Sequence, residues 1–172
     1  MKIVETLISQ EDIQKRVQGI AKVISAEYSD ANPIFVGLLK GSFIFMADLV
    51  RSLTIPCEID FMVPSSYGNS TKSSGVVRLL YDIEVDISGR DVILVEDIVD
   101  TGLTLNFIKK ELSLRNPKSV KVCALLEKGD AKMCEVEVDY LGFSIPDKFV
   151  VGYGLDYAQQ YRNLPSISIL EL

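Results

Sequence analysis

The sequence contains no histidine at all. Its absence removes the side chain that most often transfers protons near neutral pH, the Ser-His and Cys-His nucleophile pairs, and every metal site that uses an imidazole ligand. Any chemistry performed by this chain must therefore use carboxylates, lysines, hydroxyl groups or the backbone.

Cysteine is scarce, with three residues, Cys57, Cys123 and Cys134, and no C-x-x-C spacing. An odd number of cysteines in apolar, strand-like surroundings is more typical of buried, reduced thiols than of disulfides or zinc ligands. We expect these thiols to be structural.

Long apolar runs are also missing. The N-terminal "MKIVETLISQED" has neither an extended apolar core nor a small-residue cleavage site, and no later run reaches the roughly 18 to 20 residues that a membrane-spanning helix needs. These features predict a cytoplasmic protein with no membrane partner.

The charge balance is acidic, with a net charge of −6. Such a chain is not expected to adhere broadly to nucleic acid or to an anionic membrane. A small anionic ligand would have to be held by local donors or by a metal ion.

The chain has 172 residues, of which 48% are apolar, and this predicts a single domain over 1–172. Periodicity and turn residues predict helices over 8–29, with Ser9 as N-cap, 42–53 and 103–116, and strands over 32–40, 57–63, part of 76–90, 91–95, 119–128, 139–145, 148–154 and 166–170. Strands that alternate with helices, several of them apolar throughout, predict an α/β fold with a mainly parallel sheet. The polar tract 64–75 is expected to be a mobile loop.

Three carboxylates, Glu96, Asp97 and Asp100, stand where the apolar strand 91–95 is expected to end. In open α/β sheets, ligands bind beyond the carboxyl ends of the strands. The following helix would present free backbone amides near residues 101–104 to a phosphate, and the neighbouring acids suit magnesium. The alternative is a solvated acidic turn that caps a helix.

The order of residues favours the ligand site. "VILVEDIVDTGLT" (92–104) resembles the phosphoribosyl-diphosphate signature of the purine phosphoribosyltransferases. Segments at 38–49, 64–75, 125–128 and 145–165 are similar, in the same order, to segments of the bacterial hypoxanthine (hypoxanthine-guanine) phosphoribosyltransferases. By contrast, "GLLKGS" lacks the Walker spacing, and "GYGLDY" fails the dinucleotide fingerprint.

This resemblance implies a type I phosphoribosyltransferase fold, with a hood drawn mainly from about 128–172 and a lid at 64–75. It implies transfer of a phosphoribosyl group from 5-phosphoribosyl 1-diphosphate to hypoxanthine or guanine, which gives IMP or GMP and pyrophosphate. It also implies a Mg²⁺ cofactor and a homodimer or homotetramer.

The resemblance further implies roles for residues of the phosphoribosyl half of the site. Glu96 and Asp97 would hold the ribose hydroxyls and Mg²⁺, and Asp100 would act as general base toward the purine. The 5′-phosphate would be bound by Thr101, Gly102, Leu103 and Thr104.

Other residues are implied at the pyrophosphate and purine ends. The pyrophosphate would meet Lys40 and Gly41, which follow a cis Leu39–Lys40 peptide, together with Ser66 and Tyr67 of the lid and Arg162. The purine would meet Lys128 at its 6-oxo group, the ring of Phe149, the backbone of Val150, and Asp156 with a second Mg²⁺.

The sequence departs from the family pattern after Lys128, where relatives usually carry a proline and arginines. Here "KGDAKMC" (128–134) leaves only Lys132 near the expected basic position, a point charge in place of a bidentate fork. Two alternatives are a regulatory protein that uses this fold to bind RNA or DNA, and a phosphoribosyltransferase for adenine or orotate. The acidic composition opposes the first, and "IPDKFVVGYGLDY" (145–157) opposes the second.

Overall fold

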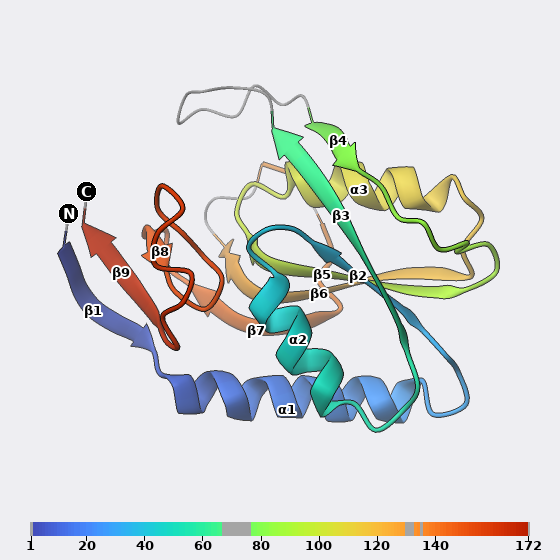
Figure 1. Cartoon of the computed structure of the whole chain (residues 1–172), viewed down its shortest axis with the longest axis horizontal. Helices are drawn as coiled ribbons and strands as arrows, with labels where there is room; N and C mark the ends of the chain where they lie inside the picture. Colours follow the sequence, from blue (N-terminus) through green and yellow to red (C-terminus); the bar gives the residue numbers. More distant parts are fainter. Residues whose placement is uncertain (1, 67–76, 130–132, 135, 172) are drawn as a thin grey trace.

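A central sheet organises the chain, as seen in a computed structural model that describes residues 2–66, 77–129, 133–134 and 136–171 (Figure 1). Its strands lie in the order β4-β3-β2-β5-β6-β7. Their bounds are β2 (Ile34–Leu38), β3 (Glu58–Ser66), β4 (Val77–Tyr81), β5 (Asp91–Val99), β6 (Ser119–Lys128) and β7 (Tyr140–Ile145). All neighbouring pairs are parallel except β3 and β4. The predicted α/β class with a mainly parallel sheet is confirmed.

Helices cover both faces of this sheet (Figure 1). α1 (Gln10–Glu27) and α2 (Phe43–Ser52) pack on one face, and α3 (Leu103–Ser113) packs on the other. α1 buries Ile13, Val17, Ile20 and Ile24, which recur at helical spacing. The Ser9 side chain accepts a hydrogen bond from the Asp12 amide, which confirms the predicted N-cap.

A smaller antiparallel sheet stands beside the carboxyl ends of the main strands. It consists of β1 (Lys2–Ile8), β9 (Ile167–Glu171) and β8 (Val150–Val151), with β9 in the middle. β1 was not predicted, because most of its side chains are exposed and it shows little burial periodicity. We call the part of the chain that carries this small sheet the hood; it combines the N-terminal strand β1 with the C-terminal segment that contains β8 and β9.

Two strands extend further than the sequence indicated. β5 continues to Val99, because its pairing with β6 extends to Val99 and Glu127. The expectation that the strand ends at residue 95 was therefore wrong, and Glu96 and Asp97 belong to the strand. β3 likewise continues to Ser66 and pairs with β4. The remainder of the expected lid, 67–75, lies outside the described residues.

The cysteines are free, as expected, but only Cys123 is fully buried, whereas Cys57 and Cys134 are partly exposed. The expectation of three buried thiols was wrong, because Cys57 precedes β3 and Cys134 lies in the connection before β7. In the part of the chain that the structure describes, no helix has the length and apolar character required to span a membrane.

Two glycines test the packing of the fold. A Cβ atom on Gly142 of β7 would lie 2.2 Å from the Leu125 carbonyl oxygen of β6, whereas one on Gly19 of α1 would meet no atom within 4 Å. We expect Gly142→Ala to lower the free energy of unfolding by about 1–3 kcal/mol. Gly19→Ala should raise it by roughly 0.5–1 kcal/mol through helix propensity. Urea denaturation of both variants provides the measurement, and equal stability of the two would contradict this packing.

Candidate active site

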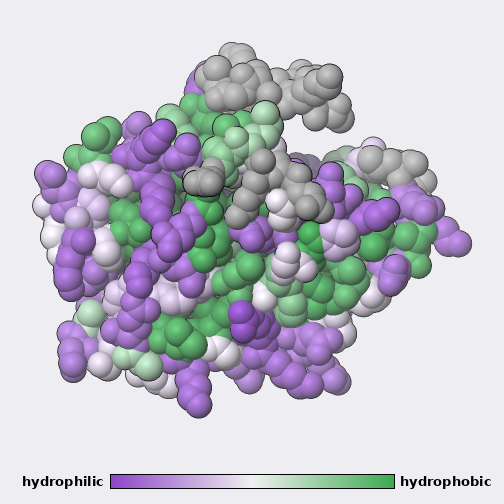
Figure 2. Space-filling view, turned by 180° about the vertical axis from the view of Figure 1, so that it is seen from behind, coloured by the Kyte–Doolittle hydropathy of each residue, from purple (hydrophilic) through white to green (hydrophobic). Residues whose placement is uncertain are grey.

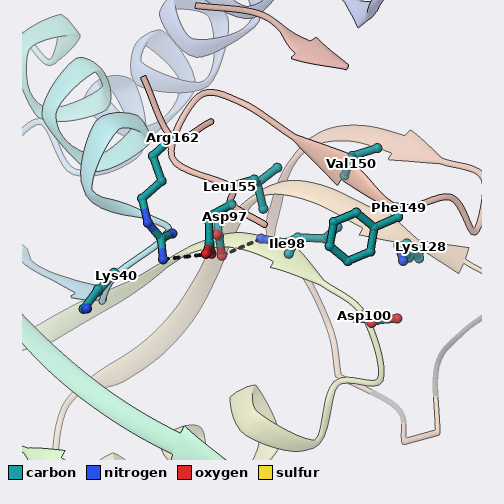
Figure 3. A pocket seen from close by; sticks show the side chains of 11 residues that line it. Lys40, Asp97, Ile98, Asp100, Lys128, Phe149, Val150, Leu155 and Arg162 are labelled. Atoms are coloured by element: carbon teal, nitrogen blue, oxygen red, sulfur yellow. Dashed lines mark hydrogen bonds and ion pairs between the residues drawn. The ribbon is translucent and has the colours of Figure 1, made fainter. Parts of the chain in front are cut away.

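A cavity of about 360 Å³ opens at the carboxyl ends of the parallel strands. It is lined by Lys40, Gly41, Asp97, Ile98, Asp100, Lys128, Phe149, Val150, Leu155, Asp156 and Arg162. Figure 3 shows Lys40 and Arg162 toward one end and Phe149 and Lys128 toward the other, with Asp97 and Ile98 between them. The cavity thus has a cationic end and an aromatic end.

A second pocket, of about 110 Å³, lies where β5 leads into α3. Ile98 and Asp100 line both pockets, so the two adjoin. Its other lining residues are Glu96, Val99, Thr101, Gly102, Thr104 and Leu105. α3 begins at Leu103, and the first amides of a helix are free to bind an anion. This pocket has the chemistry of a phosphate site.

The turn that forms the phosphate pocket is covered by residues 133–134. Gly102 has a φ of 80°, which favours glycine, and a Cβ atom there would lie 3.1 Å from the Cys134 Sγ. The Met133 amide donates to the Thr101 carbonyl oxygen at 3.0 Å. Residues 130–132, where the sequence is expected to depart from the family pattern, lie outside the described residues.

Two adjacent carboxylates of β5 are withdrawn from water. Asp97 is 8% exposed, and its Oδ1 accepts a hydrogen bond from the Ile98 amide at 2.9 Å. Glu96 Oε2 is buried, without a hydrogen-bond partner among the described residues. Burial raises the pKa of both carboxyl groups, and for Glu96 the neighbouring Asp97 raises the pKa further. A cation or a hydroxyl donor at this point would satisfy them.

The residues fit a magnesium ion that is shared with a substrate. Within the described ranges, no group of three acidic, cysteine or histidine side chains forms a ready metal cage. Mg²⁺ is commonly bound through one or two carboxylates, with water and substrate phosphates as its other ligands. Glu96 and Asp97 can supply such carboxylates.

Gly41 brings the turn after β2 against Asp97. A Cβ atom on Gly41 would lie 1.6 Å from Asp97 Oδ2, so only glycine allows this approach. The Ser42 hydroxyl donates to the Leu38 carbonyl oxygen at 2.7 Å and closes the turn. The predicted cis Leu39–Lys40 peptide is confirmed.

At the aromatic end, Lys128 and Phe149 are each held by a neighbour. Lys128 Nζ forms an ion pair with Asp147 Oδ1 at 3.0 Å, and the Lys128 side chain is only 11% exposed. Phe149 is 41% exposed as a residue, and its ring meets that of Tyr157 edge to face, with 5.7 Å between ring centroids. An exposed ring beside a partly buried lysine can stack on a planar base and donate to its oxygen.

Asp156 and Arg162 pair at the cationic end. Arg162 Nη2 lies 2.8 Å from Asp156 Oδ1, and Asp156 Oδ2 accepts from the Gln159 amide at 2.7 Å. A cation at Asp156 would therefore compete with Arg162. Binding of a metal ion by Asp156 stays a prediction.

The structure gathers the expected residues in two adjoining pockets, apart from three. Leu103 begins α3 but does not line the phosphate pocket, Ser66 ends β3, and Tyr67 lies outside the described residues. Sequence reasoning missed Ile98 and Leu155 in the cavity wall, and Asp147 and Tyr157 beside Lys128 and Phe149. Ile98 stands inside the acidic motif, and its position next to Asp97 was a usable signal.

Comparisons with known proteins agree with this geometry. The model of the phosphoribosyl transferase domain family matches residues 4–158. The hypoxanthine-guanine phosphoribosyltransferase of Bacillus subtilis is 46% identical over 98% of this chain and 94% of its own length. The hypoxanthine phosphoribosyltransferase of Escherichia coli K12 is 48% identical over 95% of this chain and 93% of its own. A crystal structure of a hypoxanthine-guanine phosphoribosyltransferase from Bacillus anthracis superposes with a TM-score of 0.94 at 45% identity, covering 99% of this chain and 100% of the other. The chain belongs to the phosphoribosyl transferase family.

Proposed function

We propose that this protein is a purine-salvage enzyme that transfers the phosphoribosyl group of 5-phosphoribosyl 1-diphosphate to hypoxanthine and guanine. The products are IMP or GMP and pyrophosphate. The names of the full-length relatives support this assignment. The proposed partners are these small molecules, without nucleic acid or membrane.

One observation carries the proposal: Asp100 lines both the phosphate pocket and the larger cavity. A ribose placed at this junction would have its 5′-phosphate at the start of α3. Its anomeric carbon would face the space between Phe149 and Arg162. The cavity thus offers one end for a purine and the other for a diphosphate.

The reaction needs no protein nucleophile. A bond forms between the anomeric carbon and the purine nitrogen, while the bond from that carbon to the pyrophosphate oxygen breaks. The proton of the purine's imidazole edge passes to the Asp100 carboxylate. Lys40 and Arg162 take up negative charge that develops on the departing diphosphate.

Residues at the aromatic end would select the base. Lys128, held by Asp147, would donate to the 6-oxo group, and Phe149 would stack on the ring, with Val150 at the base edge through its backbone. Adenine carries an amino donor at the same position, so it would leave the lysine without an acceptor.

Mg²⁺ is the proposed cofactor, held by Glu96 and Asp97 and, for a second ion, by Asp156. When bound, it would neutralise diphosphate charge and so assist departure of the leaving group. The unpartnered Glu96 Oε2 supports this placement.

The proposal extends to location and assembly. Free thiols support a cytoplasmic location. Exposed apolar side chains support a homodimer or homotetramer, and they include Phe43 of α2, Ile59 of β3, and Leu80 and Tyr81 of β4. Figure 2 also shows apolar side chains in the middle of the rear face, surrounded by polar ones.

An assay with a panel of bases tests the proposed function. We expect nucleotide formation with hypoxanthine or guanine, little or none with adenine, none with orotate, and loss of activity in chelator that Mg²⁺ restores. Xanthine completes the panel. Activity confined to adenine or orotate would overturn the base assignment, and full activity after exhaustive metal removal would overturn the cofactor assignment.

Asp100→Asn removes the proposed base while keeping its size. We expect turnover at saturating substrates to fall by about 10²- to 10⁴-fold, with binding of phosphoribosyl diphosphate retained, because the amide cannot accept the proton. Steady-state kinetics and calorimetric binding measure the two effects. Asp30→Asn, at an exposed position outside both pockets, is the control. An unchanged turnover number would reject Asp100 as the base.

Gly41→Ala tests the contact between the turn and Asp97. A methyl group 1.6 Å from Asp97 Oδ2 must displace either the carboxylate or the turn. We expect kcat/KM to fall by about 10²-fold, the effect of a displacement of roughly 1 Å in a site. Gly129→Ala is the matched control, because a Cβ atom there meets nothing within 4 Å. Equal kinetics of the two variants would contradict the contact.

A further inference from the structure

A strained turn of the hood lies against α2. Gly152, Tyr153 and Gly154 all have positive φ, at 102°, 51° and 104°. Tyr153 is the residue of this turn that is not glycine, so its conformation must be held by its surroundings. Tyr153 is 5% exposed, and its hydroxyl donates to Asp48 Oδ2 of α2 at 2.7 Å.

The same turn is in close contact with the backbone at the cationic end of the cavity. A Cβ atom on Gly154 would lie 2.0 Å from the Gly41 carbonyl oxygen, and one on Gly41 would lie 1.6 Å from Asp97 Oδ2. Gly154, Gly41 and Asp97 therefore form a stack with no space for an added methyl group. A shift of the hood turn would be transmitted through Gly41 to Asp97.

Arg162 is bound to this turn as well. Its guanidinium donates to the Gly154 carbonyl oxygen at 2.7 Å, and its carbonyl oxygen accepts from the Gly154 amide at 3.0 Å. Because these two hydrogen bonds join Arg162 to Gly154, the distance between Gly154 and the Lys40–Gly41 turn also determines the position of Arg162. Arg162, which the proposed function places beside the diphosphate, is therefore held by this turn, and Lys40 belongs to the turn that Gly154 contacts through the Gly41 carbonyl oxygen.

The hydrogen bond from Tyr153 to Asp48 has the properties of a fixed anchor. Asp48 lies on a helix that begins directly after the Gly41 turn, so the bond joins the hood to the element that carries the turn. Burial and the Asp48 carboxylate both raise the pKa of the Tyr153 hydroxyl, which therefore stays a donor at neutral pH. Neither residue lines the cavity.

We propose that Tyr153 and Asp48 are a positioning pair. They hold the hood turn, residues 152–154, at the distance from the Lys40–Gly41 turn that is required for binding the diphosphate group of phosphoribosyl diphosphate. The inference rests on the proposed function. It assigns the pair to the leaving-group end, so the purine end should be little affected by its loss.

Four variants test the pair. Tyr153→Phe removes only the donor, Asp48→Ala removes the acceptor, and Asp48→Asn keeps an oxygen that can accept the bond. The double variant Tyr153→Phe/Asp48→Ala tests whether the two residues act as a unit. Arg51→Gln is the control, because it removes the exposed ion pair that Asp48 makes on its other side, at 3.4 Å, without altering Tyr153.

We expect Tyr153→Phe and Asp48→Ala each to raise KM for phosphoribosyl diphosphate and the inhibition constant of pyrophosphate by about 10-fold or more, as a small displacement of binding groups would. KM for hypoxanthine should stay within about 2-fold. Asp48→Asn and Arg51→Gln should resemble the unmodified protein, and the double variant should be no worse than Tyr153→Phe. Melting temperatures, measured in parallel, identify a temperature at which every variant is folded.

Three results would overturn the pairing: unchanged diphosphate binding in folded Tyr153→Phe, an equal rise in KM for both substrates, or additive losses in the double variant. Calorimetric binding of phosphoribosyl diphosphate with Mg²⁺ gives a readout that does not depend on turnover. An unmodified protein without transferase activity would instead reject the proposed function, so the two failures are distinguishable.

Discussion

Parallel pairing of β5 between β2 and β6 is the constraint on which both pockets depend. Ile34–Gly37 of β2 align with Val92–Val95 of β5, and β6 continues the pairing to Val99. Parallel strands end at the same edge of the sheet. This register therefore places three features side by side: the Gly41 turn after β2, the acidic pair Glu96 and Asp97 of β5, and Lys128 at the end of β6. The hood and residues 133–134 reach over this edge. They therefore pack against strand ends whose positions are determined by the pairing of the sheet.

The acidic pair illustrates how function and stability oppose each other. Glu96 and Asp97 are drawn from water by the same strand pairing that positions them, and burial raises the pKa of both. A raised carboxyl pKa means that the folded protein holds protons more tightly than the unfolded chain. Stability therefore falls as pH rises from the unfolded pKa toward the folded one. Under the proposed function, this cost is offset when a cation or a hydroxyl donor binds Glu96 Oε2, which has no hydrogen-bond partner among the described residues.

Local patterns in the sequence were sufficient for the layers of the fold, whereas most residues of the site were predicted from the family resemblance. The helical spacing of Ile13, Val17 and Ile20, the cap at Ser9 and the apolar strands at 91–95 and 119–128 each reflect local chemistry. The roles that the resemblance implies for single residues stay predictions. What could not be predicted depends on partners distant in the chain. β1 forms only because β9 lies beside it, and β5 passes residue 95 because β6 continues there. The supports of Lys128 and Phe149, namely Asp147 and Tyr157, likewise become visible only when the segment 145–157 is folded back on β6.

The order of strands in the hood has a consequence for synthesis on the ribosome. β9 lies between β1 and β8, and every other described strand precedes it in the chain. The phosphate pocket is built from β5 and α3, whose residues have emerged long before β9. During translation, β1 therefore emerges long before its neighbour β9, at a time when the strands of the main sheet can already pair. The small sheet is thus the last part of the fold to have all its strands, so the turn between β5 and α3 can form before that sheet is complete.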